Sequence, residues 1–281
     1  MILRGLLAVL FSTMVVGCGE GMPDDAELDP IDVASDQQAV TTVSAQEALS
    51  WGLDWIDEVK AAPSRMSENH YTASSTELER MVGTKKASNR NVCGTLVTKL
   101  MQKSLGLDPD DFYQSFNKEM DGCSAGTVDG EQKGTNSPNA AQYRYKIANC
   151  GGTGPIKFTK RTTIGGVRTG DVLAVTYPDR TDITGHVMIV RAAPIADKSL
   201  PAGPSGSTPY AVKILDSTST PHGSSSKYPD YRGGNTGEGL GTGTFVLYAN
   251  SDGAIVASRW SPTDSTLAKA STNRIAIGGL R

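Results

Sequence analysis

Residues 185–190 read Gly-His-Val-Met-Ile-Val, and this stretch decides the predicted fold. Its apolar side chains do not alternate with polar ones, which is typical of a strand buried on both faces at the centre of a sheet. Further strands are predicted at residues 170–177, 211–216, 243–248 and 254–257. A long loop rich in Pro, Gly and Ser, residues 194–210, joins the central strand to the next one. The second half of the chain therefore predicts an antiparallel sheet.

The segments before these strands have the pattern of helices. Residues 44–62 place apolar side chains at helical spacing after a capping-box sequence, and Pro63 ends the segment. A short helix is expected at 75–82, followed by a polar loop at 83–90 and a longer helix that begins after Asn91, a favourable N-cap. Helices that precede consecutive strands predict an α+β fold, with N-terminal helices packed on an antiparallel sheet.

Residues 107–165 interrupt this order with a polar sequence rich in Gly, Asn and Asp. We expect a long insertion that leaves the core and is closed by a disulfide bond between Cys123 and Cys150, worth about 3 kcal/mol. Cysteines pair in oxidising compartments, and the chain has four of them, including Cys18 near its start. If Cys18 is modified, three are left, and Cys93 is the one expected to be free.

Composition and spacing argue against several classes of function. The chain lacks a Cys-x-x-Cys pair and has three histidines, so we expect neither a metal site nor a cofactor. The formal net charge is −3 and no Lys/Arg-rich block is present, so we expect no nucleic-acid partner.

The N-terminus has the order of an export signal. Arg4 is followed by a short apolar run at residues 6–16 and by the small residue Gly17. The next residue, Cys18, makes this segment resemble the lipobox of bacterial lipoproteins, in which the cysteine is acylated and becomes the mature N-terminus. The alternative is an ordinary signal peptide that is cut elsewhere, with Cys18 incidental. The resemblance implies a lipid-anchored protein of the bacterial cell envelope, periplasmic or surface-exposed, with the outer membrane favoured.

The expected domain organisation follows from this N-terminus. Residues 1–17 form the signal peptide, and residues 18–44 form an acidic tether without Lys or Arg, which we expect to be disordered. The tether would hold the rest of the chain away from the membrane to which Cys18 is attached. Residues 45–281 then form one α+β domain that contains the insertion.

Three residues at the ends of predicted elements suggest nucleophilic catalysis. Cys93 lies in the first turn of its helix, where the helix N-terminus and a nearby imidazole favour the thiolate. His186 opens the central strand, and Asp216 closes the following strand. If these strands pair antiparallel with Val190 opposite Val212, the side chains of His186 and Asp216 face each other on one side of the sheet. Cys93 is then the nucleophile, His186 the base and Asp216 the group that orients the imidazole.

These residues resemble the papain-like NlpC/P60 and CHAP cell-wall hydrolases. The resemblance is carried by residues 91–97, 169–173 and 185–190, with Val92 where those families often have an aspartate. It implies a papain-like α+β fold and a metal-free cysteine amidase or endopeptidase that acts on peptidoglycan or on related peptide amide bonds. The first alternative is a non-catalytic surface lipoprotein that binds cell-wall or protein ligands in the same cleft. The second is a purely structural envelope protein.

His222, Tyr71 and Arg232 are the expected substrate contacts, because loops positioned by a rigid sheet are where binding residues gather. His222 also competes with His186 for the role of base. Each member of the triad has a structural alternative as well: Cys93 as a small buried apolar side chain, His186 as a strand cap, and Asp216 as a turn residue.

Overall fold

The computed structural model describes residues 33–73, 76–116, 137–177, 185–223, 225–232, 237–269 and 274–281, and in the first helix it describes side chains from Gln46 onward. The α-helices of these ranges are α1 (Val33–Ala61), α2 (Cys93–Leu105), α3 (Pro109–Phe116) and α4 (Ala140–Asn149). Short 3-10 turns cover Pro63–Arg65 and Ile164–Gly166. No helix in the described part of the chain is both long enough and apolar enough to cross a lipid bilayer.

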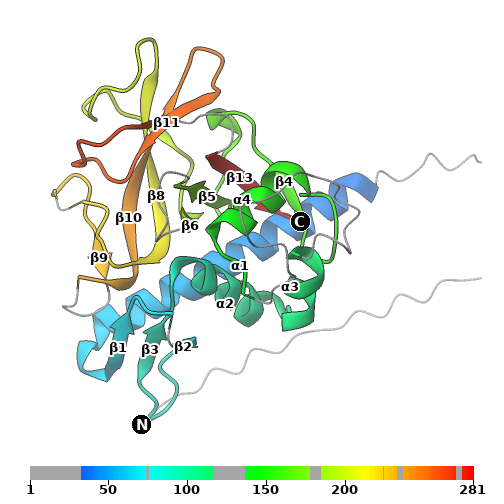
Figure 1. Cartoon of the computed structure of the whole chain (residues 1–281). Helices are drawn as coiled ribbons and strands as arrows, with labels where there is room; N and C mark the ends of the chain where they lie inside the picture. The colour runs from blue at the N-terminus through cyan, green and yellow to red at the C-terminus, as the bar shows by residue number, and fades with distance from the viewer. Residues whose placement is uncertain are drawn as a thin grey trace, which may run out of the picture. The chain divides into compact units, whose positions relative to one another are not determined.

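A large antiparallel sheet dominates the structure (Figure 1). In spatial order it contains β12 (Ala268–Lys269), β11 (Ile255–Arg259), β10 (Gly239–Ala249), β8 (Thr208–Thr218), β6 (Gly185–Val190), β5 (Val172–Thr176), β13 (Ile275–Leu280) and β4 (Phe158–Lys160). Two short strands extend it, because β7 (Ile195–Ala196) pairs with β8 and β9 (Tyr231–Arg232) pairs with β10. The strand nearest the C-terminus, β13, lies between β4 and β5.

A smaller sheet precedes α2 and is attached to the large one by asparagine side chains. It contains β1 (Met66–His70), β3 (Ala87–Arg90) and β2 (Glu77–Glu79), with β1 parallel to β3. The Asn69 side chain accepts the backbone N–H of Leu240 at 2.8 Å and donates to its carbonyl at 3.0 Å. Because these are the two backbone groups that a neighbouring strand would satisfy, Asn69 pairs with the edge of β10 in place of a strand.

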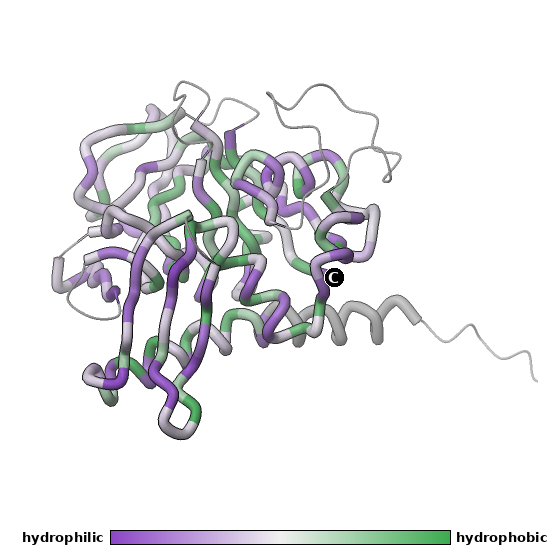
Figure 2. Tube along the Cα trace, turned by 60° about the horizontal axis from the view of Figure 1, so that its bottom comes forward, coloured by the Kyte–Doolittle hydropathy of each residue, from purple (hydrophilic) through white to green (hydrophobic). Residues whose placement is uncertain are grey.

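Alternation along the strands sends side chains to opposite faces of the large sheet, where the two larger hydrophobic clusters lie. Helices α1, α2 and α4 cover one face of the large sheet, and the cluster there includes Trp55, Leu96, Leu100, Tyr143, Val172, Val187, Ile189 and Leu215. The opposite face carries Leu173, Met188, Val190, Val212, Ile214, Phe245 and Leu247. In Figure 2 the hydrophobic residues, in green, gather where the helices meet the strands. Both faces of β6 are therefore buried, as its sequence predicts.

The strand positions predicted from the sequence are confirmed, but the predicted fold class is wrong. The five expected strands correspond to β5, β6, β8, β10 and β11. However, two sheets make the described chain mostly β-structure, and the region expected to be helix and loop at 75–90 forms β2 and β3 instead. These three-residue and four-residue strands are too short for their side-chain alternation to be told from a turn of helix. A papain-like α+β fold with N-terminal helices does not describe this arrangement.

The expected insertion at 107–165 is also corrected where it is described. Helix α4 packs between α2 and the strands β5, β6 and β13, and its Tyr143 and Ile147 side chains are fully buried, as are Phe112 and Ile156. These apolar residues are few and widely spaced, so the polar average of the segment conceals them. The described residues of this segment, 107–116 and 137–165, therefore contribute to the core.

The N-terminal predictions fall largely outside the described residues, including the signal peptide, the lipidation of Cys18 and most of the acidic tether. Residues 33–44 of the expected tether belong to α1. Cys150 is disulfide-bonded, and its predicted partner Cys123 lies outside the described residues. Cys93 is a free, buried cysteine, as predicted.

Candidate active site

The site lies where β6 and β8 separate. These two strands pair only through Ile189 with Leu215 and Val190 with Ile214 within their described lengths. Before Ile189 the β8 side of β6 is open, and there the sulfur of Cys93 accepts the backbone N–H of Val187. Cys93 is the first residue of α2, so the separation of the strands lets a thiol at the start of a helix reach a backbone group of the sheet.

Two glycines make this approach possible. A Cβ on Gly94 would lie 2.5 Å from the carbonyl oxygen of Pro138, so the first turn of α2 packs directly against the chain before α4. Gly185 has φ +146°, and a Cβ there would lie 1.9 Å from the Val175 carbonyl oxygen. Only glycine tolerates that conformation and that contact, so Gly185 fixes how the chain enters β6 immediately before His186.

Cys93 and His186 are hydrogen-bonded and favour the ionised pair. Although burial opposes the thiolate, His186 and the N–H groups of Val187 and Gly94 lower the pKa of Cys93. Burial likewise opposes the imidazolium, but Cys93 and Asp216 raise the pKa of His186 to about 9. The two shifts have opposite directions, and both favour a thiolate beside an imidazolium.

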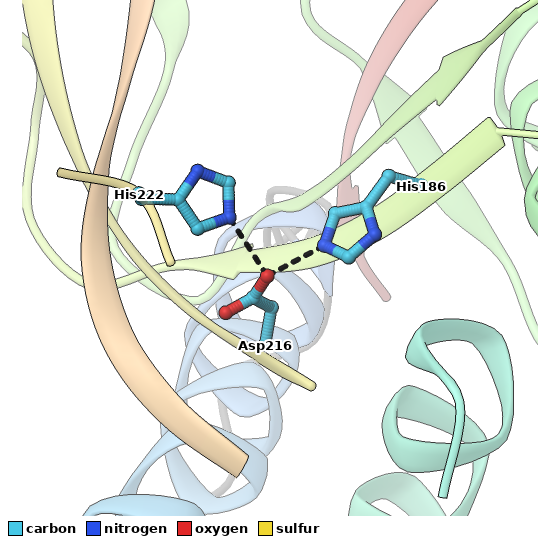
Figure 3. Close-up of side chains that lie close together, drawn as sticks. All are labelled: His186, Asp216 and His222. Atoms are coloured by element: carbon cyan, nitrogen blue, oxygen red, sulfur yellow. Dashed lines mark hydrogen bonds and ion pairs between the residues drawn. The ribbon is translucent and has the colours of Figure 1, made fainter. Parts of the chain in front are cut away.

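Asp216 binds the other side of the His186 ring. Nε2 of His186 lies 2.5 Å from Oδ2 of Asp216, which leaves Nδ1 as the ring nitrogen that faces Cys93. Figure 3 shows Nδ1 directed away from the carboxylate. The predicted strand register is wrong, because Val190 pairs with Ile214 and not with Val212. The error of two residues preserves the side of the sheet, so the predicted contact between His186 and Asp216 is still made.

The Asp216 carboxylate is fully buried and held by three side chains. Its Oδ2 accepts from both His186 and His222, and the two rings approach that oxygen from opposite sides (Figure 3). Its Oδ1 accepts Nη1 of Arg232 at 2.6 Å. Burial opposes ionisation, but Arg232 and the histidines hold the pKa of Asp216 well below its usual range. The carboxylate therefore stays ionised and keeps the His186 ring in one orientation.

The three predicted substrate contacts lie in different places. Tyr71 is partly exposed and its hydroxyl hydrogen-bonds to Cys93; burial and the Cys93 charge raise the pKa of Tyr71, so this hydroxyl is a donor. His222 is fully buried behind Asp216 and offers no surface to a substrate. Arg232 is 5% exposed, and its guanidinium binds both Asp216 and Asp230. His222 and Arg232 thus support the triad, and only Tyr71 lies beside the sulfur.

The sequence analysis missed a row of glycines on β10 that makes room for this support. Gly241 pairs directly with Asp216, and a Cβ on it would lie 2.5 Å from Cδ of Arg232. A Cβ on Gly243 would lie 2.6 Å from Cβ of His222. Residues 239–243 read Gly-Leu-Gly-Thr-Gly, and glycine at alternate positions of a strand indicates that another group packs closely against one of its faces.

Trp260 is a second residue that the sequence analysis missed. Its indole stacks on the ring of His222, with centroids 3.8 Å apart and an interplanar angle of 27°. The same indole meets the His186 ring edge-on at 4.8 Å. Trp260 therefore shields both histidine rings from solvent and limits their rotation.

Three of these side chains have the composition of a metal site. Ligand atoms of His186, Asp216 and His222 lie within 4.8 Å of one another. The surrounding charges do not favour a divalent cation, because Arg232 already pairs with Asp216 and the other nitrogen of His186 serves Cys93. The donor set fits a hydrogen-bonded charge cluster better than a coordination sphere.

Comparison with known proteins corrects the expected kinship and location. The chain is 29% identical over 178 residues to an uncharacterized protein of Acanthamoeba polyphaga mimivirus, a match that covers 60% of this chain and 67% of the viral one. No family model matches the chain, and no solved structure matches it. The similarity to a viral protein overturns the assignments to the NlpC/P60 and CHAP hydrolases and to the bacterial cell envelope as a lipoprotein.

Proposed function

We propose that this chain is a cysteine hydrolase, an amidase or peptidase, that cleaves amide bonds in peptides. The observation that carries the proposal is the continuous chain of hydrogen bonds from Cys93 through His186 to Asp216. Nucleophile, base and orienting carboxylate are the three parts that acyl transfer through a thiolate needs. Cys93 is held by helix α2, His186 by strand β6, and Asp216 by its buried hydrogen-bond partners.

The chemistry follows from the ion pair. The Cys93 thiolate attacks the amide carbonyl carbon, and the imidazolium of His186 gives its proton to the leaving amine nitrogen. A water molecule then attacks the thioester and loses a proton to the neutral imidazole. Collapse of that intermediate releases the acid and restores the thiolate, and His186 keeps its proton.

The start of α2 can stabilise the oxyanion. The N-cap residue Val92 makes no side-chain cap, and the first N–H groups of a helix have no partner within it. The N–H of Cys93 is one of these groups, and it lies beside the carbon that the sulfur attacks. The protonated hydroxyl of Tyr71, which hydrogen-bonds to Cys93, is a second donor beside the sulfur.

The test separates reactivity from turnover. Wild-type protein is treated with iodoacetamide at neutral pH, and the modified peptide is identified by mass spectrometry. We expect Cys93 to react faster than glutathione under the same conditions, because its thiolate is stabilised.

Cleavage is then measured on a peptide library and on purified peptidoglycan, with products identified by mass spectrometry. Cys93→Ala should release no products and keep the wild-type circular dichroism spectrum. Identical products from the two proteins would refute the proposal. Fast alkylation of Cys93 without cleavage of any amide would instead favour ligand binding without catalysis.

A further inference from the structure

His222 is bound on both ring nitrogens by groups that only accept hydrogen bonds. Its Nδ1 lies 2.6 Å from the carbonyl oxygen of Trp260, and its Nε2 lies 2.9 Å from Oδ2 of Asp216. A peptide carbonyl has no proton, and the Asp216 carboxylate is ionised. Both nitrogens of His222 must therefore donate, and an imidazole that donates from both nitrogens is an imidazolium.

The cluster around Asp216 has the partners that such a cation needs. Arg232 donates to Oδ1 of Asp216 and, through Nε and Nη2, to both oxygens of Asp230. Asp230 Oδ2 also accepts the backbone N–H of His222 at 2.7 Å. With His222 protonated, two carboxylates face two cations, and the cluster is neutral. A neutral His222 would leave one buried negative charge uncompensated and one short hydrogen bond without a proton.

We propose that His222 is a positioning residue protonated on both ring nitrogens, which neutralises Asp216 together with Arg232 and holds Oδ2 of that carboxylate against His186. This inference rests on the proposed function, because its effect is exerted on the Cys93–His186 pair. His222 does not touch the reacting atoms. Its role is to let Asp216 orient the imidazole without adding net negative charge beside the thiolate.

Removing this cation should change the ionisation of the catalytic pair. The Asp216 charge would act on Cys93 and His186 with less compensation, so the thiolate would be less favoured and the imidazolium more favoured. In the described part of the chain, the tyrosines that interact with Cys93 are Tyr71 and Tyr143, and Tyr177 lies beside Tyr71. They are uncharged when protonated, so they do not replace the missing positive charge.

The first measurement uses the wild-type protein. In ¹⁵N-histidine NMR at about pH 7, both ring nitrogens of His222 should have the chemical shifts of protonated nitrogens. A neutral tautomer of His222 at about pH 7 overturns the inference, whatever the variants do.

The second measurement follows the rate of Cys93 alkylation by iodoacetamide against pH. In His222→Gln, an uncharged side chain can still donate one N–H to Asp216, and the pH at which the thiolate forms should rise by roughly half a unit to one unit. The matched control is His70→Gln, because His70 is an exposed histidine that pairs with Glu238. This control should leave the profile unchanged.

The outcomes separate the two proposals. A normal profile in His222→Gln, with wild-type Cys93 reactive, overturns the positioning role and leaves the hydrolase intact. An unreactive Cys93 in the wild type overturns the hydrolase, and the NMR result still decides the protonation of His222. If His222→Gln does not fold, His222→Phe, which keeps the stack on Trp260, supplies the second profile and should shift in the same direction.

Discussion

The Ser217 hydroxyl donates a hydrogen bond of 2.7 Å to the backbone carbonyl of Asn91. Both residues are buried, and they lie 126 positions apart in the sequence. Ser217 follows Asp216, and Asn91 lies two residues before Cys93. This one bond therefore sets the distance between the helix that carries the nucleophile and the strand that carries the carboxylate.

Ser217→Ala should lower the rate of peptide hydrolysis even under conditions in which the variant remains folded. The Asn91 carbonyl would be left buried without this donor, at a cost of about 1–3 kcal/mol in the free energy of unfolding. Urea denaturation and peptide hydrolysis are measured on the same sample. Thr218→Val is the matched control, because among the described residues the Thr218 hydroxyl bonds within its own turn, to Thr220. Equal rates in both variants would contradict the spacing role of Ser217.

Asp216→Asn should reduce kcat by roughly 10²–10⁴-fold with a smaller change in KM, because the imidazole loses the acceptor that orients it. The amide introduced by this substitution would also face Arg232 and His222 with a donor group, so we expect lower stability. Asp197→Asn is the matched control: Asp197 is a carboxylate bonded to Lys227 and Tyr228, away from the site. The control should hydrolyse substrate at the wild-type rate.

The dependence of kcat/KM on pH should be bell-shaped. The pKa of Cys93 is lowered, so the acid limb should fall below the ordinary range of a thiol. The pKa of His186 is raised to about 9, so activity should be lost through about pH 9 as the imidazolium loses its proton. Asp216 contributes to that raised value, so Asp216→Asn should move the alkaline limb to lower pH. An alkaline limb near 6.5 in the wild type would contradict the ion pair.

Gly241→Ala should destabilise the protein by about 1–3 kcal/mol, because its Cβ would press on Arg232 and on the carbonyl of Tyr231. Displacing Arg232 should also weaken its hold on Asp216 and slow hydrolysis. Gly165→Ala is the control, since nothing lies within 4 Å of a Cβ there and its φ is not positive. Thermal unfolding of both variants decides the comparison, and equal melting temperatures would refute the packing argument.

The positions of Cys93, His186 and Asp216 were predictable from the sequence. Two of them depend on where a helix or strand begins, and that of Asp216 depends on which side of its strand the side chain lies. Cys93 opens α2, His186 opens β6, and Asp216 keeps the same side of β8 when the register moves by two residues. The N-cap was misplaced by one residue: Val92 occupies it, and Asn91 instead donates its side-chain amide to Asn89 and to the carbonyl of Glu77. A favourable capping residue was used for a tertiary contact that local propensity does not reveal.

The fold class and the roles of the supporting residues were not predictable in this way. Strands β2 and β3 belong to a small sheet with β1, and that sheet is tied to the rest of the structure by a contact distant in sequence, the one between Asn69 of β1 and Leu240 across 171 positions. His222 and Arg232 looked like loop residues available to a ligand, because sequence does not show which loops fold back over a charged group. Their burial depends on the glycines of β10, which leave space instead of making contacts.

The position of β13 between β4 and β5 has a consequence for biosynthesis. Residues 275–280 must leave the ribosome before those two strands have their common neighbour, so this part of the sheet cannot close during earlier synthesis. Until then β4 and β5 present open edges, which are templates for aggregation. Contacts of such long sequence separation also slow folding. Nascent chains that stop before residue 275 should therefore associate with chaperones and lack the hydrolytic activity that we propose, so the site around Cys93 forms only after translation has passed that point.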